Sequence, residues 1–329
     1  MQEPSSQTAE NPLSSASIRG STSPIHALEN LPPAPEPILW EHAPGKFLAW
    51  NEFGEPSGTP VFYYHGWPSS RLQARLAHNL ARDRNIRLIS MDRPGIGKST
   101  LIQNRKLEDW PPLIARFADH LQIEKFGQIG VSGGGPYVLA CAAKIPERLI
   151  GSAVLAGMVP LPFTNHGKEG LHPIYRTLIP LRKLPSPLFG LGFRIAAFTC
   201  KSPPDSFPMN LLVKSLSKQD RDIMLHSQQI WEVLTRSFTE GVVSSSGGQG
   251  VMTDSEIYLS ESQIIPEEIT HPIHYWHGGD DKNIPLTLVR ELTHKMPNAK
   301  LCTEETLGHF SLAVHCASAA LDHIRTNME

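Results

Sequence analysis

The sequence predicts an α/β fold in which a mainly parallel, doubly wound sheet is covered by helices on both faces. Short apolar runs of strand length alternate with segments of helical pattern through most of the chain, as in folds built from strand-helix-strand units. Polar turns follow several of these runs, where functional groups gather at the carboxyl ends of parallel strands. The alternation stops between Val159 and Ile269, which predicts an inserted unit.

The predicted strands are short, apolar and bounded by turn residues, which is typical of strands buried on both faces of a parallel sheet. They lie near residues 60–65, 87–92, 126–131, 150–157, 272–277 and 299–304. A helix that packs on this sheet is predicted by an apolar stripe at helical spacing. The stripe consists of Trp110, Leu113, Ile114, Phe117 and Leu121.

A serine follows the third predicted strand in the sequence Gly130-Val131-Ser132-Gly133-Gly134, and helix formers follow from Pro136 to Ile150. This strand-to-helix turn matches a G-x-S-x-G nucleophile elbow. Gly130 and Gly134 allow a tight turn without a Cβ in the way, and the Gly133 amide lies at a helix N-terminus, where it can face an anion. From these residues alone, a glycine-rich turn with an incidental serine is an equally good interpretation.

A serine nucleophile needs a histidine to take its proton and a carboxylate to orient that histidine. On a strand-turn-helix scaffold these partners follow the serine in the order Asp or Glu, then His. The run at residues 272–277 ends in a turn with Asp280 and Asp281, and the run at 299–304 leads to His309 at the start of the last helix. The sequence therefore offers both partners in the required order.

These motifs resemble the α/β-hydrolase superfamily with a serine nucleophile. The segment from His277 to Pro285 is similar to a pattern of that superfamily, which assigns the acid to Asp281 and leaves Asp280 as a turn residue. Gly308-His309-Phe310 is similar to the pattern that carries the base, which assigns that role to His309. The resemblance implies an eight-stranded α/β-hydrolase sheet.

A second part of the resemblance lies upstream, where the run at residues 60–65 leads into His65-Gly66-Trp67-Pro68. In the superfamily a backbone amide of this loop completes the oxyanion hole, which implies the amide of Trp67 together with that of Gly133. Two such donors would each stabilise the negative oxygen of a tetrahedral intermediate by roughly 3–4 kcal/mol. His65 and Gly66 are expected to support the loop, with the His65 ring holding its shape.

The resemblance covers about residues 46–161 and 268–327 and divides the chain into units. The expected units are a disordered Ser/Pro-rich tail over residues 1–38, an α/β-hydrolase core over 39–161 and 268–329, and a helical cap over 162–267. The tail has too little apolar surface to fold. The cap has helical patterns around residues 210–217 and 218–239, with a glycine-rich bend at 244–250. It would roof a pocket that favours an apolar acyl or alcohol group.

The composition limits the classes of partner that we expect the protein to bind. At 329 residues and 40% hydrophobic content the chain can form one large core and an accessory unit. A net charge of −2 gives no electrostatic reason to bind nucleic acid or an anionic membrane, and no stretch is long and apolar enough for a transmembrane helix. The four separated cysteines predict neither a disulfide framework nor a zinc site and favour a cytoplasmic protein. No cofactor is expected, and the oligomeric state stays open.

The histidines at positions 271, 274 and 277 invite a metal site. Side chains alternate between the two faces of a strand, so His274 and His277, an odd number of residues apart, should point in opposite directions. The sequence therefore predicts no metal site on this strand.

The predicted function is hydrolysis of a carboxylic ester or related small acyl substrate through an acyl-enzyme, with a Ser-Asp-His triad. Serine at the elbow disfavours epoxide hydrolysis and dehalogenation, which use a carboxylate nucleophile in the superfamily. A proline-releasing aminopeptidase stays open if carboxylates of the cap face the site. The candidates for that role are Glu232, Glu240, Asp254 and Glu256. Acyl transfer on the same triad and a slow-turnover, receptor-like binding protein also stay open.

Overall fold

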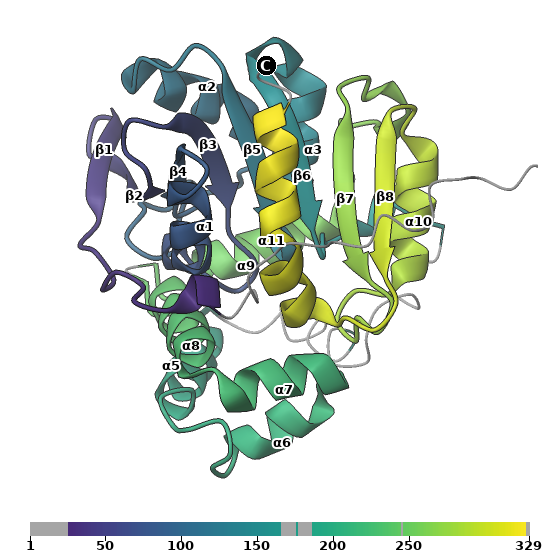
Figure 1. The fold of residues 1–329 in the computed structure, drawn as a ribbon. Coiled ribbons are helices and arrows are strands. Elements are labelled where there is room, and N and C mark those ends of the chain that lie inside the picture. The colour runs from purple at the N-terminus through teal and green to yellow at the C-terminus, as the bar shows by residue number, and fades with distance from the viewer. Residues whose placement is uncertain (1–25, 166–175, 177–185, 245, 327–329) are drawn as a thin grey trace, which may run out of the picture.

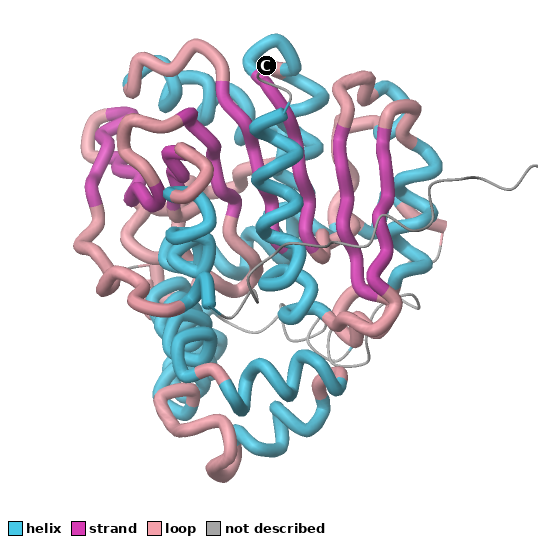
Figure 2. The backbone as a smooth tube through the Cα atoms, viewed as in Figure 1, coloured by secondary structure: helices cyan, strands magenta, loops and turns pink. Residues whose placement is uncertain are grey.

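The structure, a computed structural model, describes residues 26–165, 176, 186–244 and 246–326. It confirms the predicted α/β fold: an eight-stranded sheet with strand order β1-β2-β4-β3-β5-β6-β7-β8 carries helices on both faces (Figures 1 and 2). From β3 to β8 all neighbouring strands are parallel, while β2 pairs antiparallel with both β1 and β4. The sheet is therefore mainly parallel, as predicted.

The strands end where the sequence places the polar turns. Their bounds are β1 (Ile38–Ala43), β2 (Lys46–Gly54), β3 (Thr59–Tyr64), β4 (Ile86–Met91), β5 (Phe126–Val131), β6 (Leu149–Leu155), β7 (Ile273–Gly278) and β8 (Ala299–Glu304). The sequence predicts the six strands from β3 onward to within about two residues. It does not locate the first two strands. β1 is an edge strand that is partly exposed on both faces, and the polar residues Asn51 and Glu52 interrupt the apolar run of β2.

Two helical layers cover the sheet. The helices are α1 (His78–Arg82), α2 (Trp110–His120), α3 (Gly135–Lys144), α10 (Leu286–Lys295) and α11 (His309–Thr326). Residues of α2, α3 and α10 share one buried cluster with Phe62 and Tyr64 of β3. Residues of α1 and α11 share a second cluster with Val61 and Tyr63 on the opposite face. The predicted stripe of α2 is buried at Leu113, Ile114 and Phe117.

The segment between β6 and β7 adds helices beyond the carboxyl ends of the strands (Figure 1). They are α5 (Ser186–Thr199), α6 (Met209–Ser215), α7 (Lys218–His226), α8 (Gln228–Val242) and α9 (Gln249–Leu259). The single helical pattern expected over 218–239 is split, because Ser227 starts a new helix by accepting a hydrogen bond from the Ile230 amide (3.3 Å). Residues 166–175 and 177–185 of the expected cap lie outside the described residues.

The glycine-rich bend expected at residues 244–250 leads into a helix that the sequence did not predict. Gly248 has φ +87°, a conformation that favours glycine, and α9 starts at the next residue. Gly250 packs against the turn after β4, since a Cβ there would lie 2.1 Å from the carbonyl carbon of Gly95. The bend therefore brings α9 back onto the core.

Residues 26–37 are packed against the core, which differs from the expected disorder of residues 1–38. Leu28 is buried with α7 and α8 residues. Asn79 donates hydrogen bonds to the carbonyls of Ala27 (2.9 Å) and Glu29 (2.8 Å), and Arg75 donates to the carbonyl of Pro32 (2.8 Å). Hydrogen bonds from the core to backbone carbonyls compensate for the small apolar content of this segment. Residues 1–25 lie outside the described part of the chain.

Candidate active site

Ser132 lies on the sharp turn between β5 and α3. Its φ is +51°, a left-handed conformation that is uncommon for a residue with a Cβ and that clusters at functional sites. A Cβ on Gly130 would lie 2.7 Å from the Gly134 carbonyl oxygen, and one on Gly134 would lie 2.0 Å from the Tyr64 carbonyl oxygen. Both flanking glycines are therefore required by close backbone approaches, as in a nucleophile elbow.

The structure brings Ser132, His309 and Asp281 into one hydrogen-bonded series. The Ser132 Oγ lies 2.9 Å from His309 Nε2, and His309 Nδ1 lies 2.8 Å from Asp281 Oδ2. A carboxylate can only accept, so Nδ1 donates to Asp281 and Nε2 is left to accept the serine proton. The three residues follow β5, β8 and β7 respectively, so they meet at the carboxyl ends of parallel strands.

The geometry distinguishes the two neighbouring aspartates. Asp281 is buried, and its Oδ1 accepts hydrogen bonds from the amides of Asn283 (2.7 Å) and Ile284 (2.8 Å). This leaves its Oδ2 aimed at His309. Asp280 forms a surface ion pair with Lys282 at 2.6 Å instead. Of the two, Asp281 is the one in contact with the histidine.

The charges of the buried pair support each other. Burial alone would lower the pKa of His309, but the Asp281 carboxylate, its hydrogen bond and the nearby Asp220 outweigh burial and raise that pKa above 6.5. Burial alone would raise the pKa of Asp281, but His309 and His277 hold it below 3.8. Asp281 is therefore ionised at neutral pH, and His309 is ready to take up a proton.

The loop with Trp67 lies directly beside the elbow. A Cβ on Gly133 would lie 3.0 Å from the Trp67 backbone nitrogen, and one on Gly66 would lie 3.5 Å from the Ser132 Cβ. Gly66 is held by a hydrogen bond from its amide to Gln73 Oε1 (2.7 Å). The backbones of Trp67 and Gly133 are thus neighbours next to Ser132.

His65 has a position consistent with its expected supporting role. Its Nε2 accepts a hydrogen bond from the Arg93 amide (3.4 Å), so the proton is on Nδ1, which donates to the Gly66 carbonyl (2.8 Å). Complete burial and the nearby Arg93 lower the pKa of His65 well below 6.5. The neutral ring bridges the end of β3 and the turn after β4.

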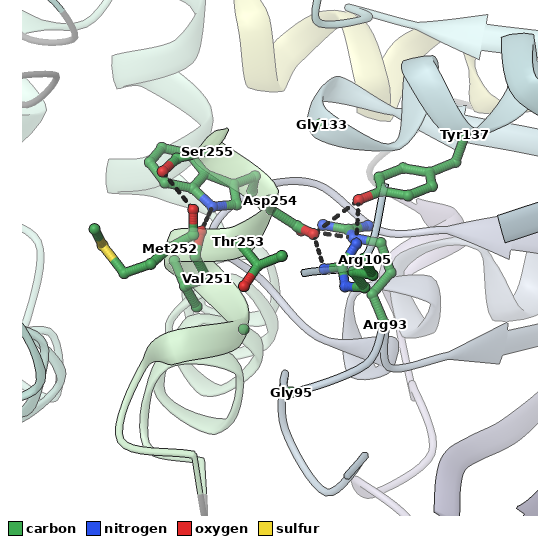
Figure 3. A network of polar contacts seen from close by, with 12 residues as sticks. Arg93, Gly95, Arg105, Gly133, Tyr137, Val251, Met252, Thr253, Asp254 and Ser255 are labelled. Atoms are coloured by element: carbon green, nitrogen blue, oxygen red, sulfur yellow. Dashed lines mark hydrogen bonds and ion pairs between the residues drawn. The ribbon is translucent and has the colours of Figure 1, made fainter. Parts of the chain in front are cut away.

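A buried polar network connects α9 to this loop (Figure 3). Asp254 of α9 accepts from Arg93 Nε (2.7 Å) and from the Tyr137 hydroxyl (2.7 Å), and it also pairs with Arg105. Arg93 in turn donates to the carbonyls of His65 (2.6 Å) and Gly66 (2.9 Å). Burial opposes ionisation of Asp254, but the two arginines lower its pKa to about 2. The carboxylate therefore stays ionised, and both of its oxygens are engaged by the two arginines and Tyr137.

A cavity of about 670 Å³ opens at Ser132 between the core and the inserted helices. No Asp, Glu, Lys or Arg side chain of the described residues lines it. Its walls are mostly large and apolar, and include Leu76, Phe189, Phe193, Trp231, Leu234 and Phe238. The volume is that of a pocket for a small organic ligand, and the lining favours uncharged groups.

The four carboxylates that were candidates for holding a substrate's amino group do not line this cavity. Glu232 pairs with Arg75, Glu240 with Arg71, and Asp254 belongs to the buried network. Glu256 lines a separate surface cleft of about 510 Å³.

The strand histidines point in opposite directions, as predicted. His274 stacks on His323 of α11 with ring centroids 3.7 Å apart. His277 is buried on the other face, where Nε2 donates to the Ile284 carbonyl (2.8 Å).

Within the described ranges, no helix combines the length and apolarity needed to cross a bilayer.

The sequence did not indicate which residues of the inserted helices contact the backbone of the site. Asp220 of α7 contacts the start of α11, and Tyr258 of α9 donates to the Gly133 carbonyl (2.8 Å). From the sequence, Asp254 is a candidate only for binding a substrate's amino group. No local motif marks these side chains, because their partners lie on distant segments.

Comparisons with known proteins agree with the fold. The sequence model of the alpha/beta hydrolase fold family matches residues 59–175. A poly(3-hydroxyalkanoate) depolymerase from Ectopseudomonas oleovorans is 31% identical over 280 residues, which is 81% of this chain and 83% of that protein. A non-heme haloperoxidase from Rhodococcus erythropolis is 25% identical over 287 residues, 84% of this chain and 94% of that protein.

Two further comparisons have a narrower meaning. One match is to a dihydrolipoyllysine-residue acetyltransferase component of an acetoin cleaving system from Pseudomonas putida. It is 32% identical over 113 residues, and it spans 34% of this chain and only 30% of that protein. The solved structure of an alpha/beta hydrolase fold protein from Nakamurella multipartita superposes with a TM-score of 0.62 at 19% identity, covering 85% of this chain and 96% of that one. At that identity the likeness concerns the fold alone.

Proposed function

This chain belongs to the α/β-hydrolase family, and we propose that it is a serine hydrolase that cleaves uncharged carboxylic esters with apolar acyl or alcohol groups. The observation that carries this proposal is the series Ser132, His309 and Asp281, hydrogen-bonded at 2.9 and 2.8 Å at the edge of an apolar cavity. A hydroxyl with this partner arrangement is an activated nucleophile.

In the proposed mechanism, Ser132 Oγ attacks the ester carbonyl while His309 Nε2 takes the serine proton. The amides of Trp67 and Gly133 stabilise the negative oxygen of the tetrahedral intermediate. His309 then gives the proton to the leaving alcohol, and an acyl-enzyme remains on Ser132. Water attacks this ester with His309 again as base, and release of the acid restores the serine. Asp281 fixes the histidine tautomer and stabilises the imidazolium.

The cavity supports an ester rather than a peptide substrate. Burying a charged group without a partner is costly, and no described acidic side chain lines the cavity to hold a substrate's amino group. Among the described residues, a peptide substrate's amino group would therefore find no anionic partner in this cavity. The Ectopseudomonas oleovorans relative is named for depolymerising poly(3-hydroxyalkanoate), a polymer joined by ester bonds, which supports the same choice.

Turnover of a series of p-nitrophenyl esters tests this function. We expect kcat/KM to rise from acetate toward medium acyl chains by up to about fourfold per methylene, because each buried CH₂ contributes about 0.8 kcal/mol. A chain of equal length that ends in a carboxylate should react more slowly. The control is Ser132→Ala under the same conditions. Wild-type turnover no higher than that of the control across the series would refute the proposal and favour a binding protein.

The pH dependence of kcat/KM provides a second test. His309 must be neutral to accept the serine proton, and its pKa is raised above 6.5. Activity should therefore be complete above that pKa and fall as the pH drops through it, with a midpoint higher than 6.5. The profile is measured with an uncharged ester so that the substrate does not titrate. A midpoint below 6.5 would contradict the role of Asp281 beside the base.

A further inference from the structure

Asp220 of α7 lies at the N-terminus of α11, the helix that begins with His309. Its Oδ2 accepts from the His309 amide (2.9 Å), and its Oδ1 accepts from the Phe310 amide (3.0 Å) and from the amide and hydroxyl of Ser311 (both 2.8 Å). The side chain is buried. A carboxylate at this position satisfies amides that have no partner within the helix and complements the helix dipole.

The backbone just before the base also packs on α7. A Cβ on Gly308 would lie 2.0 Å from Ser217 Oγ and 2.4 Å from Asp220 Oδ2. The Gly308 amide donates to Ser311 Oγ (2.8 Å), which itself donates to Asp220. The glycine before the histidine is therefore required by the inserted helix, and the position of His309 depends on α7.

On the other side of Ser132, α9 contacts both backbones that would form the oxyanion hole. Asp254 orients Arg93 (Figure 3). Arg93 in turn donates to the carbonyls of His65 and Gly66, just before Trp67. The Trp67 indole donates to the Val251 carbonyl of α9 (2.8 Å). Tyr258, also on α9, donates to the Gly133 carbonyl (2.8 Å).

From these contacts we propose that Asp220 and Asp254 are positioning residues: Asp220 holds the base, Asp254 holds the Trp67 loop through Arg93, and Tyr258 holds the Gly133 backbone of the elbow. The inference rests on the proposed function. It makes the inserted helices part of the catalytic architecture, because a small displacement of a reacting or stabilising group is enough to lower the rate. A purely structural role would change stability and leave the kinetic signatures below unchanged.

The two carboxylates should give different signatures. The titratable groups that face His309 are Asp281 on the loop after β7, His277 behind it, and Asp220 on α7. Loss of the Asp220 charge removes one anion that favours the imidazolium, so the acid limb should move to lower pH. The Asp254 network faces the Trp67 loop instead, so its loss should lower kcat without moving that limb.

The first experiment compares Asp220→Asn with Asp222→Asn on the same helix, using p-nitrophenyl butyrate. Asparagine can replace the contacts of Oδ1, but its amide group then meets the His309 N–H. We expect kcat to fall about tenfold or more and the acid limb of kcat/KM to move to lower pH, with neither change in the control. If Asp220→Asn does not fold, Ser311→Ala, which removes one link to the same carboxylate, should still lower kcat. The role of Asp220 would be overturned if folded Asp220→Asn kept both the kcat and the acid limb of the wild type. It would also be overturned if Ser311→Ala, used in its place, kept the wild-type kcat.

The second experiment compares Asp254→Asn and Tyr258→Phe with Glu256→Gln, which lies on the exposed side of α9. Both test variants should lower kcat by about tenfold or more while the acid limb stays in place. Tyr258→Phe removes a single oxygen and keeps the test decisive if the Asp254 variant, with its unpaired arginines, does not fold. Rates equal to that of Glu256→Gln would overturn the role of α9.

The proposed function and this inference fail in different ways. If wild-type protein turns over no ester above the Ser132→Ala background, the proposed function fails. If the wild type is active and the background is low, but the folded Asp220, Asp254 and Tyr258 variants match their controls, only the positioning inference fails.

Discussion

Ser132→Ala is expected to lower kcat for an ester substrate by about 10⁶-fold, and His309→Ala by a similar factor. Alanine at either position removes one member of the proposed triad. Without the Ser132 Oγ no acyl-enzyme forms. Without the His309 imidazole, whose Nε2 lies 2.9 Å from that Oγ, no group accepts the serine proton. The double variant should be no slower than either single variant, because the residues act together. Stopped-flow and long-time assays of the three proteins measure these rates.

His294→Ala is the matched control for the base. His294 is exposed on α10, and its Nδ1 is hydrogen-bonded to the Arg290 carbonyl in its own helix (2.6 Å). We expect wild-type kinetics for this variant. A His309→Ala protein that keeps more than about a hundredth of the wild-type kcat would contradict the assignment of the base, since deletions of such residues cost far more.

Asp281→Asn is expected to lower kcat by about 10⁴-fold while leaving the fold intact. The asparagine oxygen can still accept from the amides of Asn283 and Ile284. Its NH₂ group then faces His309 Nδ1, which must become an acceptor, so the ring proton moves to Nε2. That is the nitrogen that has to receive the serine proton, and the base is therefore blocked.

Asp280→Asn provides the control from the neighbouring position. Asp280 contacts Lys282 at the surface, where an ion pair contributes little to stability, so kcat should stay within about twofold of the wild type. Steady-state kinetics of the two variants decide between the aspartates. A greater loss in Asp280→Asn than in Asp281→Asn would reverse the assignment made from the 2.8 Å contact with His309.

The sequence could predict the features that depend on local pattern. Most strands from β3 onward are mainly apolar runs, and Ser132 lies in a five-residue motif that is visible in the sequence itself. The order of Asp281 and His309 along the chain follows from the fold. The choice of Asp281 over Asp280 came from a family resemblance, and the structure adds the two amides that aim its other oxygen.

What the sequence could not predict depends on contacts between distant segments. Asp220 and His309 are 89 residues apart, and Asp254 and Arg93 are 161 residues apart. From the sequence alone, Asp220 and Asp254 resemble ordinary charged residues. Residues 26–37 have a composition typical of disorder, and contacts with distant side chains, among them Arg75 and Asn79, explain why they are held. The start of α9 was obscured because a left-handed Gly248 makes a bend and a helix start look alike.

The central claim is that Ser132 is the nucleophile, and covalent labelling with a fluorophosphonate followed by intact-mass and peptide analysis tests it most directly. We predict one adduct per chain, located on Ser132, absent in Ser132→Ala and strongly slowed in His309→Ala. An adduct that forms equally well in Ser132→Ala, or a wild-type protein that takes up no label while folded, would contradict this claim.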